Sequence, residues 1–257
     1  MVSQPFPKNM NLAEAHTRDK DVEFDEPAHK YTIKGCTDFT SVTTFIGTLF
    51  EKFDADAVVT KMMKGRNWAN SKYYGMSAEE IKQQWADAGT EAAAEGTKMH
   101  SEIENYYKTN REQPSVITAE FAQFLAFAEN FKLRPYRSEW RVYDEDIKIV
   151  GTVDMLFETP EGKICIYDWK RAKKIEKFDN WGKRCTHPLL SHVHDTNFWH
   201  YALQLNLYQY ILENKYGLTV CERALVCCHP TRTHFERVDI PDMQEEIRLL
   251  FSTTDNV

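Results

Sequence analysis

The heptapeptide CIYDWKR, residues 165–171, places the strongest constraint on this chain. An apolar run typical of a buried strand ends there in Asp168, Trp169 and Lys170. Asp and Lys are poor strand formers and are seldom buried without a partner. Because strand side chains alternate with a period of two, Asp168 and Lys170 lie on the same face of this strand. The stretch therefore predicts that other charged groups face this strand end.

The preceding strand supplies a first partner. Residues 160–162 (PEG) predict a three-residue hairpin loop with Gly162 in the left-handed conformation, and this register places Asp154 opposite Asp168. Two opposed carboxylates repel unless a cation lies between them or they share a proton. Hard oxygen ligands on two short strands suit Mg²⁺ or Mn²⁺. We expect Lys170 to orient or deprotonate a water, or to neutralise charge on a phosphate.

Helical patterns precede residue 132 and strand patterns follow it. Ser77 and Glu80 form a capping-box signature ahead of a long helix. Three successive strands then predict an antiparallel meander, so the chain is expected to be α/β. A length of 257 residues with 42% hydrophobic content fits one domain with appendages. The expected segments are a loose tail at 1–21, a hairpin and helical portion at 22–115, a catalytic core at 116–257, strands near 136–143, 147–157, 163–170 and 220–228, and a crossover helix at 197–215.

Two helical motifs carry further polar chemistry. His100 and Glu104 share one helical face at i and i+4, and Gln204 and Tyr208 do the same on a later helix. Gly151 allows close backbone approach just before the first acidic residue. A single His or Gln on a helix is more often an ordinary residue, and a plain Asp–Lys ion pair at a sheet edge is the alternative interpretation of the strand motif.

Four motifs in this order resemble a known family. GTVD at 151–154, DWK at 168–170, QxxxY at 204–208 and GTxxH at 96–100 are similar to the RecB-type branch of the PD-(D/E)XK nucleases. The DWK motif and the helical N-terminal portion resemble most closely the group of the mitochondrial genome maintenance exonuclease and its viral and phage relatives. The resemblance covers about residues 22–240. It implies an α/β restriction-endonuclease-like core, with a mixed sheet flanked by helices and a helical N-terminal portion.

The resemblance also implies a role for each matched residue. The implied metal ligands are His100, Asp154, Asp168 and the Trp169 backbone carbonyl. The implied catalytic residues are Asp154, Asp168 and Lys170, with Gln204 and Tyr208 positioning the strand or supporting the site. Glu104 and Glu139 are expected in the surrounding shell, where they would brace the site.

The implied activity is divalent-metal-dependent hydrolysis of DNA in replication, repair or recombination, by an exonuclease that prefers single-stranded ends. Replication or recombination proteins are the expected partners, and Mg²⁺ or Mn²⁺ the expected cofactor. Members with an iron–sulfur cluster carry three spaced cysteines after the nuclease motifs, whereas the late cysteines here are 221, 227 and 228. No cluster is therefore expected. The alternatives are a cap-snatching-like RNA endonuclease and a non-catalytic nucleic-acid-binding module.

Charge is segregated along the chain. The net charge of −7 argues against coating of nucleic acid by bulk positive charge. Residues 163–184 nevertheless contain eight Lys or Arg and three Asp or Glu. Expected substrate contacts are Arg171, Lys173, Lys174, Arg184, Gln204 and Tyr208. Residues 172–196 lack a clear period, which is typical of a mobile, partly basic loop. The alternative interpretation is that this loop closes over single-stranded DNA, with Trp181, Arg184 and His187 offering stacking or phosphate contacts.

The N-terminal segment has neither the apolar centre of a signal peptide nor the Arg-rich, acid-poor composition of a transit peptide. No apolar run approaches the roughly 18 residues that span a bilayer. We therefore expect an intracellular protein without a membrane partner, in the cytoplasm or nucleus, including those of a virus-infected host.

Overall fold

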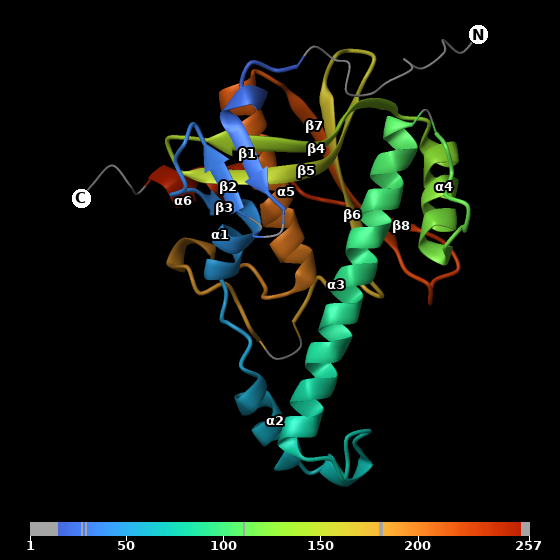
Figure 1. The fold of residues 1–257 in the computed structure, drawn as a ribbon. Helices are drawn as coiled ribbons and strands as arrows, with labels where there is room; N and C mark the ends of the chain where they lie inside the picture. Colours follow the sequence, from blue (N-terminus) through green and yellow to red (C-terminus); the bar gives the residue numbers. More distant parts are fainter. Residues whose placement is uncertain (1–14, 27, 29, 110, 180–181, 253–257) are drawn as a thin grey trace.

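A computed structural model describes residues 15–26, 28, 30–109, 111–179 and 182–252 (Figure 1). Its helices begin after the capping residues that the sequence provides, such as Ser41 for α1, Asp54 for α2 and Ser77, with its capping box, for α3. The helices are α1 (Val42–Thr48), α2 (Ala55–Met63), α3 (Ala78–Lys108), α4 (Ala119–Phe131), α5 (Asn197–Tyr216) and α6 (Gln244–Ser252).

The strands form a two-stranded hairpin and a six-stranded mixed sheet. They are β1 (Val22–Asp25), β2 (Lys30–Ile33), β3 (Thr40–Ser41), β4 (Arg134–Asp144), β5 (Ile149–Glu158), β6 (Ile164–Arg171), β7 (Val220–Cys228) and β8 (Glu236–Asp239). The expected meander is confirmed, because β4, β5 and β6 pair antiparallel. α5 is the expected crossover, since it joins β6 to the parallel strand β7. The short parallel strand β3, beside the start of β5, has no counterpart in the sequence prediction.

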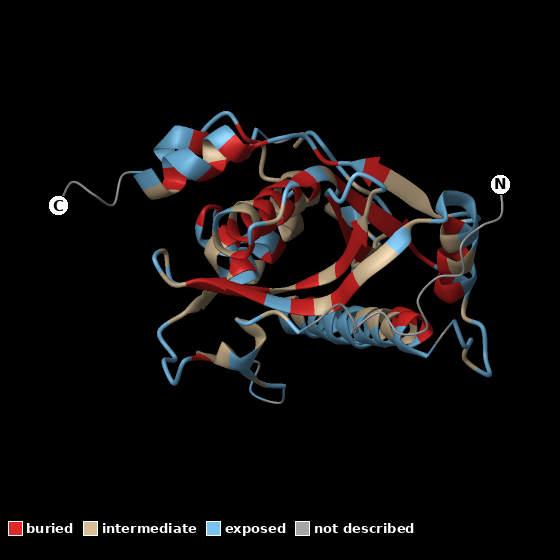
Figure 2. Ribbon diagram, turned by 90° about the horizontal axis from the view of Figure 1, so that it is seen from above, coloured by how far each residue is buried: buried red, intermediate tan, exposed pale blue. Residues whose placement is uncertain are grey.

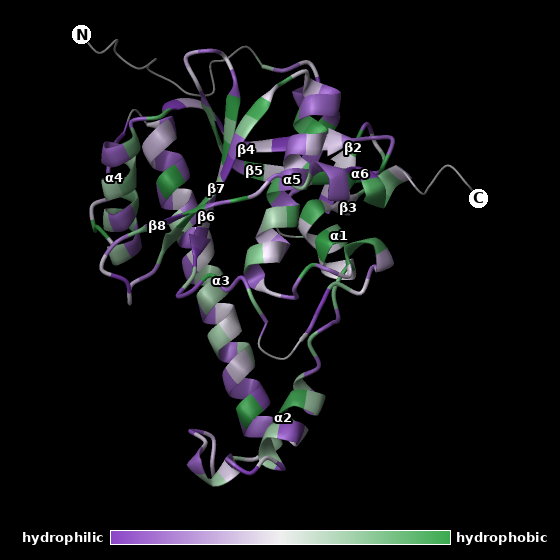
Figure 3. Cartoon of the chain, turned by 180° about the vertical axis from the view of Figure 1, so that it is seen from behind, coloured by the Kyte–Doolittle hydropathy of each residue, from purple (hydrophilic) through white to green (hydrophobic). Residues whose placement is uncertain are grey.

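Helices cover both faces of this sheet, as the predicted fold class requires. Alternate side chains of β6 enter two different cores, with Ile164 and Ile166 packed against α5 and Cys165 and Tyr167 packed towards α3 and α4. Figure 2 shows the buried residues concentrated in the sheet and α5. Figure 3 shows hydrophobic residues along the strands and α1, whereas polar residues alternate with apolar ones along α3.

The long helix α3 extends beyond the body of the protein and carries α2 beside its far end (Figure 1). Its buried residues are Ile81 near the start and Met99, Ile103, Tyr106 and Tyr107 near the end. The intervening turns are largely exposed. Only the last third of α3 therefore packs on the sheet, and this third contains His100.

The hairpin between β5 and β6 has the predicted register. Met155 pairs with Tyr167 and Phe157 with Cys165, and Gly162 has a φ of 78°. The ladder ends at the Met155–Tyr167 pair, directly before Asp154 and Asp168 would meet. The two strands therefore separate at the carboxylates.

The N-terminal segment differs from its prediction. Residues 15–21, expected within a loose tail, pack against β4, because Asp19 accepts hydrogen bonds from Arg137 Nη1 and Trp140 Nε1, each at 2.7 Å. Arg18 also pairs with Glu145. These partners lie more than a hundred residues away along the chain, so local sequence patterns could not reveal them. The rest of the predicted tail, residues 1–14, lies outside the described residues.

Candidate active site

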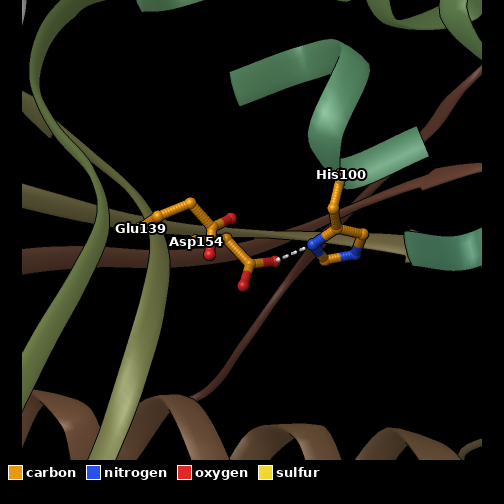
Figure 4. Close-up of side chains that lie close together, drawn as sticks. All are labelled: His100, Glu139 and Asp154. Carbon is orange, nitrogen blue, oxygen red and sulfur yellow. Dashed lines mark ion pairs between the residues drawn. The ribbon is translucent and has the colours of Figure 1, made fainter. Parts of the chain in front are cut away.

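Three side chains from three elements converge beside the point where β5 and β6 separate (Figure 4). His100 comes from α3, Glu139 from β4 and Asp154 from β5, and one ligand atom from each lies within 4.8 Å of the others. His100 Nδ1 is 3.5 Å from Asp154 Oδ2. One imidazole nitrogen and two carboxylate oxygens form a donor set that divalent cations accept.

Glu139 reaches this cluster because of the β4–β5 register. Its neighbours Ser138 and Trp140 pair with Met155 and Val153, so Glu139 lies directly across from Asp154. Its φ of 47° is a conformation that non-glycine residues rarely adopt and that occurs often at functional sites. The sequence predicts Glu139 only in the surrounding shell, whereas the structure places it beside the two other ligands. Counting back through the β4–β5 hairpin is the signal that could have placed it beside Asp154.

The electrostatics of the cluster favour a cation. Burial, and then the nearby carboxylates of Asp154, Glu104 and Asp168, raise the pKa of Glu139 to about 9. Crowded, partly buried carboxylates repel one another and are stabilised by a positive charge between them. The residues present therefore fit a bound divalent metal ion.

Asp168 and Lys170 form a second, adjacent unit. Lys170 Nζ lies 2.7 Å from Asp168 Oδ2, and the Asp168 side chain is 3% exposed. Burial and the Asp154 carboxylate raise the pKa of Asp168 to about 6, against the effect of Lys170. Burial alone would lower the pKa of Lys170, but the carboxylates of Asp168 and Asp154 hold it above its usual value. The expected convergence of two carboxylates and one ammonium is present.

The α5 residues lie behind this unit. Gln204 Nε2 donates to Asp168 Oδ1 at 3.3 Å, and both Gln204 and Tyr208 are buried. Burial, and then Asp154 and Asp168, raise the pKa of Tyr208 well above its usual value. Tyr201, which the sequence analysis did not single out, places its ring 4.5 Å from Lys170 Nζ. Its position one turn before Gln204 is the signal that could have identified it.

The backbone of Trp169 links the two units. Its N–H donates to Asp154 Oδ2 at 2.9 Å, in place of a hydrogen bond in the β5–β6 ladder. The indole is buried against Phe124 and Phe127 of α4. The Trp169 carbonyl as a metal ligand stays a prediction. Glu104 lies one turn after His100 on α3 and forms an ion pair with Lys108 at the margin of the cluster.

Comparison with known proteins identifies the family. A sequence model of the PD-(D/E)XK nuclease superfamily matches residues 56–249. The chain belongs to this superfamily. No curated protein matches the sequence significantly. Among solved structures, the crystal structure of SSO0001 is similar at 13% identity, covering 85% of this chain and 75% of that chain, with a TM-score of 0.30. A superposition this loose carries no argument about function.

A PD-(D/E)XK nuclease fold implies a nucleic-acid substrate, and positively charged side chains would contact its phosphates. The basic residues predicted for this role differ in how far they are exposed and in whether they form ion pairs. Arg171 Nε bonds Glu120 Oε1 at 2.7 Å, so its guanidinium is held against α4. Lys174 forms an exposed pair with Glu176. Lys173 and Arg184 are exposed. Trp181 lies outside the described residues, and His187 precedes a short 3-10 turn in the 172–196 loop.

A basic groove lies between α2 and the 172–196 loop of this PD-(D/E)XK protein, near the start of α3. Its volume is about 1020 Å³, and its lining includes Lys61, Arg66, Trp68 and Lys183. Residues 61–72 contain four Lys or Arg and no Asp or Glu. This basic run is not among the substrate contacts predicted from the sequence. Within the described residues, no helix is both long and apolar enough to cross a bilayer.

Proposed function

We propose that this protein is a divalent-metal-dependent deoxyribonuclease of the RecB-type branch, acting as an exonuclease on single-stranded ends. The observation that carries the proposal is the juxtaposition of His100, Glu139 and Asp154 with the Asp168–Lys170 pair. A nitrogen and several carboxylate oxygens stand beside a partly buried ammonium, which is the combination that phosphodiester hydrolysis uses.

His100, Glu139 and Asp154 would hold the metal ion, with Asp168 completing the acidic set. Mg²⁺ or Mn²⁺ bound there would supply Lewis-acid polarisation and favour ionisation of water near neutral pH. Lys170 contributes N–H donors and positive charge where negative charge develops on the phosphate. Asp168 fixes the Lys170 side chain by their ion pair, and the Tyr201 ring restricts it from another side.

The buried positions of Gln204 and Tyr208 support a role in holding the site rather than in contacting the strand. Gln204 orients Asp168 through its side-chain amide, and Tyr208 packs against the glycine that begins the GTVD motif. Residues that fix the rotamers of a catalytic group keep it within reach of the reacting atoms.

The preference for single strands is supported by the groove between α2 and the 172–196 loop. Trp68 offers a ring for a base to stack on, while Lys61 and Arg66 offer charge to the phosphates. Lys183 also lines the groove and pairs with Glu51. The start of α3 is bound to α2 and to the segment that precedes α3, because Lys82 pairs with Asp56 at 2.6 Å and Trp85 Nε1 donates to Tyr73 Oη at 2.7 Å. A fixed basic and aromatic surface suits a flexible single strand better than a duplex.

The test is cleavage of end-labelled single-stranded DNA, duplex DNA and RNA with Mg²⁺, Mn²⁺ or EDTA. Lys170→Ala is run in parallel, with Lys148→Ala as the control, because Lys148 pairs with Asp38 on the surface. We expect metal-dependent loss of single-stranded DNA, starting at an end, with wild type and Lys148→Ala but not Lys170→Ala. Preferential cleavage of RNA would favour the endonuclease alternative. DNA binding without any cleavage would favour the non-catalytic module.

A further inference from the structure

A second pocket opens directly beside the carboxylate cluster. Its volume is about 310 Å³, and it shares Glu104 and Glu139 with the candidate site. Lys108, Ser138 and Arg141 line it as well. This volume is at the lower end of the range for small-molecule sites, so the pocket suits one nucleotide-sized group.

The N-terminal segment forms one wall of this pocket. Ala15, Asp19 and Val22 line it, and Asp19 is bound to both Arg137 and Trp140 of β4. The wall is therefore part of the packed structure. A strand entering from the carboxylate cluster meets these packed residues on this side of the pocket, which favours a chain end there over a continuing strand.

Two polar side chains in the pocket have no hydrogen bond or ion pair to another side chain in the described part of the chain. Ser138 is 7% exposed, yet its Oγ has no hydrogen-bond partner there. Arg141 is exposed, stacks on Phe24 and has no carboxylate within ion-pair distance among the described residues. A buried hydroxyl without a partner is costly, so an acceptor supplied by a ligand would relieve it.

We propose that this pocket binds the terminal phosphomonoester of a nucleic-acid strand, next to the bond that is cut. Arg141 provides the guanidinium that phosphate oxygens favour, and Ser138 Oγ donates to one of these oxygens. Lys108, which pairs with Glu104, adds positive charge at the margin. The inference rests on the proposed function, since it assigns the end of that same substrate.

The test measures binding without cleavage. Fluorescence anisotropy of Lys170→Ala with Mg²⁺ compares four single-stranded DNAs: with a 5′-phosphate, with a 3′-phosphate, with hydroxyl ends, and circular. We expect one phosphorylated end to bind about tenfold more tightly than hydroxyl ends or circles, and which end does so assigns the polarity. Adding Arg141→Ala or Ser138→Ala should remove this preference.

Arg134→Ala is the matched control, because Arg134 lies at the other end of β4 and pairs with Glu158 on the surface. It should leave the preference for the phosphorylated end unchanged. Equal binding of all four DNAs, or equal weakening of all four by Arg141→Ala, would overturn the inference in favour of a general backbone contact. If wild type cleaves DNA but binding shows no preference for a phosphorylated end, only the assignment of the pocket is refuted. If binding shows this preference but the protein cleaves no substrate, only the proposed function is refuted.

Discussion

His100 Nδ1 lies 3.5 Å from Asp154 Oδ2, and this contact joins the end of a 31-residue helix to the centre of the sheet. His100 is held there because the next turns of α3 bury Ile103, Tyr106 and Tyr107. The packing of one short helical stretch therefore sets the distance between a nitrogen ligand and a carboxylate ligand. The candidate metal site depends on this packing as much as on the ligands themselves.

Metal binding should stabilise the folded protein through this cluster. At free Mn²⁺ about a hundred times Kd, a single site adds about 2.7 kcal/mol to the free energy of unfolding. Glu139→Gln removes one ligand and should weaken Mn²⁺ binding on the order of tenfold or more. In EDTA the variant should be no less stable than wild type, because burial and the neighbouring carboxylates disfavour the charged form of Glu139 in the folded protein and Gln carries no charge. Thermal unfolding with and without Mn²⁺ measures both effects.

Glu129→Gln, on the exposed side of α4, is the control for this experiment. It should leave the Mn²⁺-dependent rise in Tm unchanged. An unaltered Mn²⁺ response in Glu139→Gln would exclude Glu139 as a ligand.

The basic groove should bind single-stranded DNA through stacking and charge. Trp68→Ala should weaken binding by about 1–3 kcal/mol if one base stacks on the indole. Arg66→Ala should reduce the salt dependence, lowering the slope of log K against log salt by about 0.7. Titrations of labelled oligonucleotide at several salt concentrations measure both. Phe131→Ala, an exposed ring at the end of α4, should leave the affinity unchanged, and an equal loss there would count against a specific groove.

Gly151 should tolerate no side chain. A Cβ at this position would lie 2.8 Å from Tyr208 Cε1 and 3.1 Å from Val42 Cγ2, both in the core. Gly151→Ala should therefore destabilise the protein by about 1–3 kcal/mol and reduce cleavage by displacing Tyr208. The same substitution at Gly89, an exposed position in α3 with open space around it, should stabilise by about 0.5–1 kcal/mol. Denaturant unfolding of the two variants should shift in opposite directions.

The ion pair between Arg18 and Glu145, which anchors the N-terminal segment, should be sensitive to acid. Hydrogen bonding to Arg18 lowers the pKa of Glu145 from 4.5 to about 2. Because the folded-state pKa is the lower one, this stabilisation is complete above about pH 4.5 and is lost as the pH falls through about 2. The pair is partly exposed, so its contribution is at most about 1 kcal/mol. Glu145→Gln should lower Tm at pH 7, and the difference from wild type should vanish near pH 2.

Glu161→Gln, in the exposed β5–β6 turn, provides the comparison for this pH series. A constant difference in Tm between Glu145→Gln and wild type from pH 7 to pH 2 would contradict the assigned ion pair.

Much of strand β6 could be predicted from the sequence, because its determinants are local. The alternation of β6, the loop ending in Gly162 and the spacing of Asp168 from Lys170 depend on residues close together in the chain. The capping box of α3 is equally local. Local rules of this kind gave the register that places Asp154 near Asp168.

Only the tertiary structure decided which polar groups meet across elements. Glu139 joins His100 and Asp154 because β4 pairs with β5 in one register and Glu139 adopts a positive φ. Arg171 turns to Glu120 of α4, and the segment around Asp19 docks on β4. These contacts link residues far apart in the chain, and their free energy comes from packing that no local period encodes. The sequence by itself determined most of the elements and the chemistry they carry, whereas the packing of α3, α4 and the N-terminal segment decided which of these groups share a site.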